Sequence, residues 1–192
     1  MTTDAFEGRR KAFEEQYFLN KNQQLVDKLK GVFHKHVEKD AIRTATGIDD
    51  ERVLDNLVAL DVSGELLPAF KLFPLVEVAW ADGRCDKREA RAVLDAAEQN
   101  GILPGSQAYA MLENGLKDGP QPDARKAWYM FAAELRKVLD ANELAEFRQD
   151  LVEYAKRVAE SSGGILGMVL TESVNERKVR DAIEHALTRH DD

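Results

Sequence analysis

The chain has 192 residues, 44% of them hydrophobic and 32% charged, so it carries enough apolar side chains to bury a core. Its 27 basic and 35 acidic residues leave a net charge of −8, which excludes a generally basic nucleic-acid binder. The single cysteine excludes an internal disulfide framework and a cysteine-built zinc site. Because the sequence shows no signal peptide and no apolar run long enough to cross a bilayer, it predicts a cytoplasmic protein without membrane insertion.

Residues 1–44 are predicted to form an N-terminal amphipathic helical segment. Between residues 4 and 40, apolar side chains recur at helical spacing without a proline or an interior cap. They are Phe6, Phe13, Tyr17, Phe18, Leu25, Leu29, Val32 and Phe33. So much apolar surface favours coverage by a protein partner, by a second copy in a homodimer, or by the rest of the chain; the alternative is a solvated face. Charges of both signs disfavour a basic membrane-surface helix.

Residues 45–192 are predicted to form one compact all-α domain. Apolar spacing and turn residues predict helices over about 49–61, 86–100, 106–116, 124–140, 142–161 and 176–188, and a proline-interrupted apolar stretch over 66–81. Ser106 and Asp123 are the predicted N-caps of two helices, and Gly101 is predicted to end a third in the left-handed conformation. No alternating pattern of useful length predicts a strand. The expected core comprises Leu75, Val76, Ala79, Trp80, Val93, Leu94, Ala97, Phe131, Leu135 and Ile183.

Two segments of this domain resemble each other when the sequence is shifted by 89 residues. Leu94 then matches Ile183, and each segment contains a turn, an inward apolar residue, an N-cap and a helix. The N-caps in this alignment are Asp86 and Asn175. The similarity predicts a helical fold with internal pseudo-two-fold symmetry; the alternative is that any two capped amphipathic helices align equally well.

The stretch from Pro74 to Gly83, an apolar helix ending in Ala-Asp-Gly, resembles the TerB-like (tellurite resistance protein B) family. In that family an inward hydrophobe follows, and then a helix with an acidic residue at its start and a glutamate three positions on. Here these are Cys85, Asp86 and Glu89. Residues 155–167, with their double-glycine turn, resemble the family's approach to its final helix, so that the resemblance covers roughly residues 45–190.

The whole chain is also similar to uncharacterised bacterial proteins in which a TerB-like domain follows an N-terminal helical segment. Residues 9–15 and 25–29 carry this likeness. The resemblance implies an all-helical fold linked with stress and tellurite-resistance systems, without an established enzymatic reaction. Acidic residues of the family imply metal binding as a hypothesis.

Asp82, Asp86 and Glu89 form the candidate metal site. Asp86 and Glu89 share one face at a helix start because they lie three residues apart, and Asp82 could fold back toward them across Gly83. Three carboxylates with neighbouring carbonyl groups could hold Ca²⁺ or Mg²⁺. The alternative is that Asp-x-x-Glu is a capping box, which binds the free N–H groups of a helix start and needs no metal.

A second, symmetric metal site is not expected. The matching positions in the shifted alignment are Thr171, Asn175 and Lys178, and the lysine would repel a cation. Glu172 and Glu176 are the nearest substitutes, although their spacing does not require such a role.

The other reactive side chains do not combine into a complete catalytic or metal site. Cys85 is predicted to be a buried structural thiol, because it stands where the family has a hydrophobe. Glu77 lies in an apolar stretch, where burial would suit a catalytic carboxylate, although the exposed edge of the helix is the commoner place. None of the four histidines is spaced to share a metal ion with another.

Three functions follow from these patterns. The first is a non-enzymatic binding or regulatory module, linked with stress and with a divalent cation at the acidic helix start. The second is a structural homo-oligomer assembled through the N-terminal helix. The third is a metal-assisted hydrolase that uses the acidic cluster. The first is preferred because no nucleophile–base pair and no complete metal site can be named, and no catalytic residue is assigned.

Overall fold

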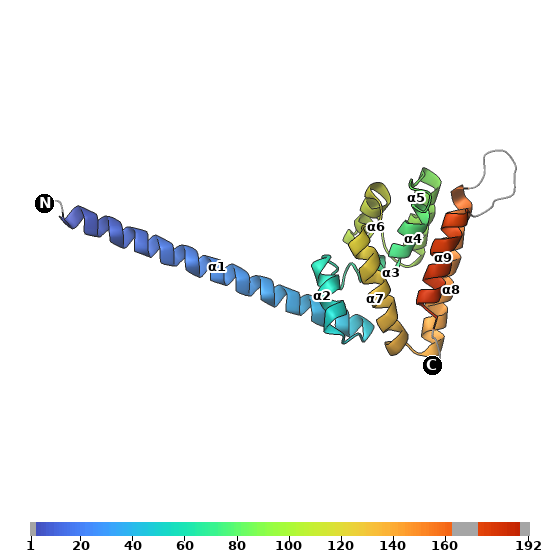
Figure 1. Ribbon diagram of the computed structural model, residues 1–192, viewed down its shortest axis with the longest axis horizontal. Helices are drawn as coiled ribbons and strands as arrows, with labels where there is room; N and C mark the ends of the chain where they lie inside the picture. The colour runs from blue at the N-terminus through green and yellow to red at the C-terminus, as the bar shows by residue number, and fades with distance from the viewer. Residues whose placement is uncertain (1–2, 163–172, 189–192) are drawn as a thin grey trace. The chain divides into compact units, whose positions relative to one another are not determined.

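The computed structural model describes the backbone of residues 3–162 and 173–188, and the side chains of Gln16 and of residues 20–161 and 173–188. Within these residues the chain forms nine α-helices and no strand, which confirms the predicted all-α fold (Figure 1). The chain divides into two compact units, Met1–Asp40 and Ala41–Asp192. No helix in the described part is long and apolar enough to cross a membrane.

Helix α1 (Thr3–Thr46) is continuous, and it extends beyond the predicted end at residue 40. The added turns belong to the second unit, where Ile42 is fully buried. Thr46 ends the helix, because its Oγ1 donates to the Ile42 carbonyl oxygen at 2.7 Å and accepts from the Ile48 N–H at 3.2 Å. Gly47 follows with φ of +73°, a left-handed conformation that glycine adopts without strain. The predicted domain boundary between residues 44 and 45 therefore falls inside the last turn of α1.

Four predicted apolar residues of α1 have side chains outside the described set: Phe6, Phe13, Tyr17 and Phe18. The predicted turn around Gly163 and Gly164 also lies outside the described residues.

Helix α4 (Phe73–Ala79) lies at the centre of the second unit. All seven of its residues are buried, and the helix contacts α5, α6, α7, α8 and α9. Such all-round burial is typical of a helix that is apolar on every side. Pro74 at its start, together with Pro68 at the start of α3 (Leu67–Lys71), explains why the apolar stretch forms two short helices.

Helices α5 (Lys87–Gln99), α8 (Ala141–Ser162) and α9 (Val174–Ala186) each contact α4, and α8 also contacts α5 and α9. Figure 1 shows α8 and α9 lying side by side. Arg148, near the start of α8, donates to the Thr188 hydroxyl just after α9 at 3.4 Å, so the two helices are antiparallel. The start of α9 therefore lies near the end of α8.

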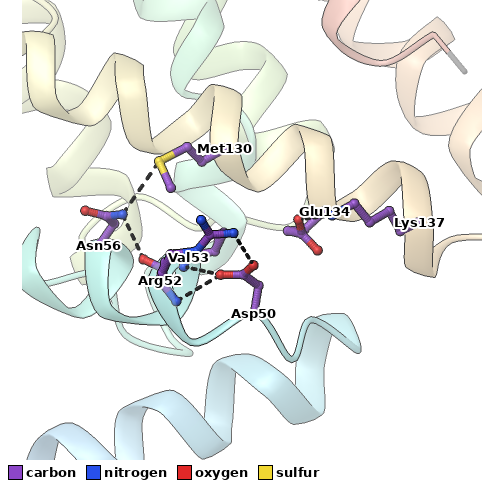
Figure 2. Close-up of polar contacts among 7 residues, drawn as sticks. All are labelled: Asp50, Arg52, Val53, Asn56, Met130, Glu134 and Lys137. Carbon is purple, nitrogen blue, oxygen red and sulfur yellow. Dashed lines mark hydrogen bonds and ion pairs between the residues drawn. The ribbon is translucent and has the colours of Figure 1, made fainter. Parts of the chain in front are cut away.

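Helices α2 (Glu51–Ala59), α6 (Gln107–Asp118) and α7 (Pro122–Val138) complete the second unit. Asp50 caps α2 by accepting from the backbone N–H groups of Arg52 and Val53, as Figure 2 shows. Asn56 points from α2 toward α7 and donates to the Met130 sulfur at 3.6 Å (Figure 2). These contacts fix α2 against α7, and they are structural rather than a separate site.

The predicted core is largely confirmed. Eight of its ten residues are buried, and only Trp80 and Leu94 are half-buried at its edge. Trp80 lies at this edge because its indole N–H needs an acceptor, which the Leu116 carbonyl oxygen supplies at 3.0 Å.

Of the helix ends predicted at Gly101, Ser106 and Asp123, the first two are confirmed and the third is wrong. Ser106 caps α6 by accepting from the Tyr109 N–H, and Gly101 has φ of +76°. Asp123 is not an N-cap, because α7 begins one residue earlier, at Pro122. Proline suits the first helical position, where an N–H would have no intrahelical acceptor, and Asp123 is therefore in the first turn.

Candidate functional site

The predicted capping box at the start of α5 is confirmed. Asp86 Oδ1 accepts from the backbone N–H of Arg88 at 2.6 Å and from that of Glu89 at 3.0 Å. In return, Glu89 Oε2 accepts from the Asp86 N–H at 2.7 Å. One oxygen of each carboxylate thus satisfies the N–H groups that the helix start leaves free.

A second capping box opens α9, and it corrects the predicted N-cap at Asn175. The N-cap is Ser173, whose Oγ accepts from the Glu176 N–H at 3.2 Å, while Glu176 Oε2 accepts from the Ser173 N–H at 2.5 Å. The two N-caps, Asp86 and Ser173, are 87 residues apart, so the predicted shift of 89 misaligns the two helix starts. The Ser-x-x-Glu spacing carries the signal for this cap. The pseudo-two-fold symmetry stays a prediction.

Asp82 connects the two helix starts. It lies in the turn between α4 and α5, and its Oδ1 accepts from Ser173 Oγ at 3.2 Å and from Asn175 Nδ2 at 3.5 Å. Gly83, which follows with φ of +83°, allows the chain to reverse there. The role of Asn175 is therefore to bind Asp82 rather than to cap α9.

Four carboxyl groups gather at this point: Asp82, Asp86, Glu89 and Glu176, here called the acidic cluster. The side chains of Glu89 and Glu176 are buried, with 6% and 2% of their residues' surface exposed. Burial raises the pKa of Glu89, and the negative charges of Asp86, Glu176 and Asp82 raise it further, against the hydrogen bond from the Asp86 N–H. The positive ends of α5 and α9 offset part of this repulsion.

The carboxylates of the acidic cluster are arranged to form the two caps. Within the described residues, no three carboxylate, imidazole or thiol groups converge on one point as the ligands of a metal ion do. The capping role of Asp86 and Glu89 is thus confirmed. The metal site of Asp82, Asp86 and Glu89 stays a prediction, and it would use the carboxylate oxygens that the caps leave over.

Cys85 lies beside the cluster and packs against the core in a half-buried position. Burial and the charges of Glu89 and Asp86 raise the pKa of its thiol to about 11. The thiol is therefore protonated near neutral pH, which makes it a poor nucleophile and a poor metal ligand.

Glu77 is buried in α4, contrary to the expected exposed position. Its carboxylate forms an ion pair with the Arg125 guanidinium of α7, a partner 48 residues away that the local sequence pattern does not reveal. Burial raises the pKa of Glu77, and Arg125 opposes that shift. Burial and the charge of Glu77 also raise the pKa of the nearby Tyr129. This group of side chains holds α4 against α7.

An apolar pocket of about 250 Å³ opens between α3, α4 and α6. Its wall includes Phe70, Phe73, Val76 and Leu112, and Asp118 stands among its polar lining residues. The lining places no histidine, cysteine, serine or lysine there, so the pocket suits binding of an apolar group more than catalysis.

Helix α1 carries a second candidate site, an exposed apolar surface in the first unit. Leu25, Leu29, Val32 and Phe33 are 57%, 60%, 68% and 71% exposed. Two further exposed valines, which the sequence analysis omitted, extend this surface; with them it comprises Leu25, Val26, Leu29, Val32, Phe33 and Val37, here called the α1 stripe. Their helical spacing was the available signal.

Comparisons with models of known protein families, with curated proteins and with solved structures find no match to this chain. The resemblance to the TerB-like family therefore stays a prediction. What the chain does has to be inferred from its own contacts.

Proposed function

We propose that the chain is a non-enzymatic binding module that engages a protein partner through the α1 stripe. One observation carries the proposal: six large apolar side chains of a single helix are exposed together. Scattered exposed hydrophobes are common on proteins, whereas an exposed apolar row along one helix is typical of an interaction surface. A partner helix or groove would bury this row.

The groups that would suit an enzyme support the same proposal, because the carboxylates hold the fold and the thiol is not ionised. Asp86 and Glu89 cap α5, Glu77 pairs with Arg125, and the thiol of Cys85 is protonated. A metal-assisted hydrolase would have only the carboxylate oxygens that the caps leave over to bind its metal ion.

The α1 stripe also favours a second candidate, a homo-oligomer in which two copies of α1 cover each other. Native mass spectrometry of the full chain at several concentrations distinguishes the two. The binding module predicts a monomer when the partner is absent, and the homo-oligomer predicts a concentration-dependent dimer.

The acidic cluster adds a regulatory proposal, divalent-cation binding at the starts of α5 and α9. If Ca²⁺ or Mg²⁺ binds there, it raises the melting temperature of the wild type but not of Asp82→Ala. Equal shifts in both proteins, or none, would leave the cluster with its capping role alone.

The resemblance to TerB-like proteins adds a proposed link with stress. Comparing growth on tellurite with and without the gene would test this link.

The test of the binding function compares two full-length variants. Leu29→Ser with Phe33→Ser changes the α1 stripe, and Gln24→Ser with His34→Ser changes exposed residues away from it. Partners captured from cells of the source organism should be lost by the stripe variant and kept by the control, while both retain the wild-type melting temperature. Equal capture by the two variants would contradict the proposal.

A further inference from the structure

The apolar pocket between α3, α4 and α6, here called the α6 pocket, is separate from the α1 stripe. All of the described residues that line it belong to the second unit, and nine of these fourteen have apolar side chains. Val62, Phe70, Val76 and Leu112 are buried and form its inner wall. A concave apolar wall of this kind gains free energy when a ligand displaces water from it, so the α6 pocket is suited to a small molecule.

The polar lining residues lie at the mouth of the α6 pocket. Asn114, Asp118 and Gln121 are exposed, whereas the inner wall is buried. Among the described residues that line the pocket, Asp118 is the only charged one. No ion pair or hydrogen bond to another described residue engages its carboxylate. This carboxylate is therefore available to a ligand.

The mouth also includes the C-terminal end of α6. The helix ends at Asp118, and Gly119 follows with φ of +88°. The indole N–H of Trp80 donates to the Leu116 carbonyl oxygen at 3.0 Å, which fixes the last turn of the helix before any ligand arrives. The partial negative charge of a helix C-terminus adds to that of the Asp118 carboxylate. Both favour a cation at the mouth and disfavour an anion.

The size and the wall of the α6 pocket limit what fills it. Its volume is about 250 Å³. An apolar cavity of about 150 Å³ holds benzene, so the α6 pocket has room for one ring with a short side chain. The rings of Phe70 and Phe73 belong to the wall, with centroids 6.1 Å apart. Aromatic walls favour an aromatic ligand, because rings attract each other beyond the burial of their area.

We propose that the α6 pocket binds a small aromatic amine, with the ring against Phe70 and Phe73 and the ammonium group beside Asp118. The apolar wall supplies most of the affinity, and the negative charge at the mouth selects amines over acids. The proposal adds a small-molecule site to the second unit, and it does not depend on the proposed binding function of the α1 stripe.

The test uses the full chain and three probes that share one ring: phenethylamine, 2-phenylethanol and 3-phenylpropanoate. Titration followed by ¹H–¹⁵N NMR gives both the dissociation constant and the residues that respond. We expect phenethylamine to bind about fivefold more tightly than 3-phenylpropanoate, with 2-phenylethanol between them. The amide signals of Gly115 and Ala124, which line the α6 pocket, should shift on binding.

Two variants with the same change in net charge locate the selection. Asp118→Asn should reduce the fivefold preference for the amine to about twofold or less. Glu113→Gln changes an exposed residue of the same helix outside the lining of the α6 pocket, and should keep the wild-type preference.

A third variant fills the α6 pocket. Ala124→Phe places a ring at a half-buried lining position, and should weaken the binding of all three probes by about tenfold or more. Its melting temperature shows whether the fold is kept. Met111→Trp, at another half-buried lining position, makes the same test if Ala124→Phe fails to fold.

Each contrary outcome overturns a stated part of the proposal. Equal binding of the three probes to the wild type would overturn the selection of amines. No saturable binding of any probe up to about 10 mM would overturn the small-molecule site. If, in addition, Ala124→Phe abolished the capture of a protein partner, the α6 pocket would receive a side chain of that protein instead. None of these outcomes bears on the α1 stripe, which Leu29→Ser with Phe33→Ser tests.

Discussion

Helices α1 and α7 carry large apolar side chains at similar helical spacing, yet the α1 stripe is exposed, whereas Trp128, Phe131 and Leu135 of α7 are buried. Phe131 in α7 is 0% exposed and packs edge-on against Phe70 of α3, with ring centroids 5.8 Å apart. Phe33 in α1 is 71% exposed. The difference shows that periodicity predicts an apolar face, whereas its coverage depends on elements elsewhere in the chain or on another molecule.

Replacing one phenylalanine in each helix with alanine should give the largest difference in the free energy of unfolding between the core and the α1 stripe. Phe131→Ala should lower the free energy of unfolding by about 3–5 kcal/mol, because it removes a fully buried ring. Phe33→Ala should change it by less than about 0.5 kcal/mol. Urea denaturation followed by circular dichroism measures both, and a large loss for Phe33→Ala would mean that the α1 stripe belongs to the core.

The edge of the core should give an intermediate effect. Leu94 of α5 is half-buried against the core, so Leu94→Ala should cost about 2 kcal/mol, at the low end for buried leucines. The same denaturation assay applies. If Leu94→Ala leaves the free energy of unfolding unchanged, Leu94 does not contribute to the core.

The two capping boxes predict smaller effects, each due to the loss of a few hydrogen bonds at a helix start. Ser173→Ala and Asp86→Ala should each cost about 1 kcal/mol, as the loss of an N-cap does. Asn175→Ala should cost less than about 0.5 kcal/mol, because it removes only a long contact to Asp82. The opposite ranking of Ser173 and Asn175 in thermal unfolding would contradict the cap at Ser173.

The pH dependence of stability should report the buried charge of Glu89. Folding raises the pKa of Glu89, so its contribution to stability is fully present below the pKa of the unfolded chain and is lost as pH rises through the higher pKa of the folded chain. Glu89→Gln keeps an acceptor for the Asp86 N–H. Because glutamine does not ionise, the variant does not lose stability as pH rises. The variant should therefore be more stable than wild type at pH 7, with the difference shrinking toward pH 4.

A variant that is less stable than wild type at every pH would show instead that the charge of Glu89 favours folding. Thermal melts of both proteins at matched ionic strength make the comparison.

Features set by a few neighbouring residues could be predicted from the sequence. The capping box of Asp86 and Glu89 is one example, because all of its hydrogen bonds are local. Glu77 shows the opposite case, since its burial depends on Arg125 in a helix that packs against it from far along the chain. The hydrogen bond from Ser173 to Asp82 is likewise a tertiary contact, between residues 91 apart in the sequence, and no local pattern reveals it.

The central claim, that the α1 stripe is a binding surface separable from the core, is tested most directly by removing it. A chain of residues 38–192 keeps the turn that carries the buried Ile42 and lacks the whole α1 stripe. We expect cooperative unfolding with a free energy within about 0.5 kcal/mol of the full chain, measured in urea. Aggregation, or a loss of several kcal/mol, would show that the α1 stripe is part of the folded core and would contradict the account.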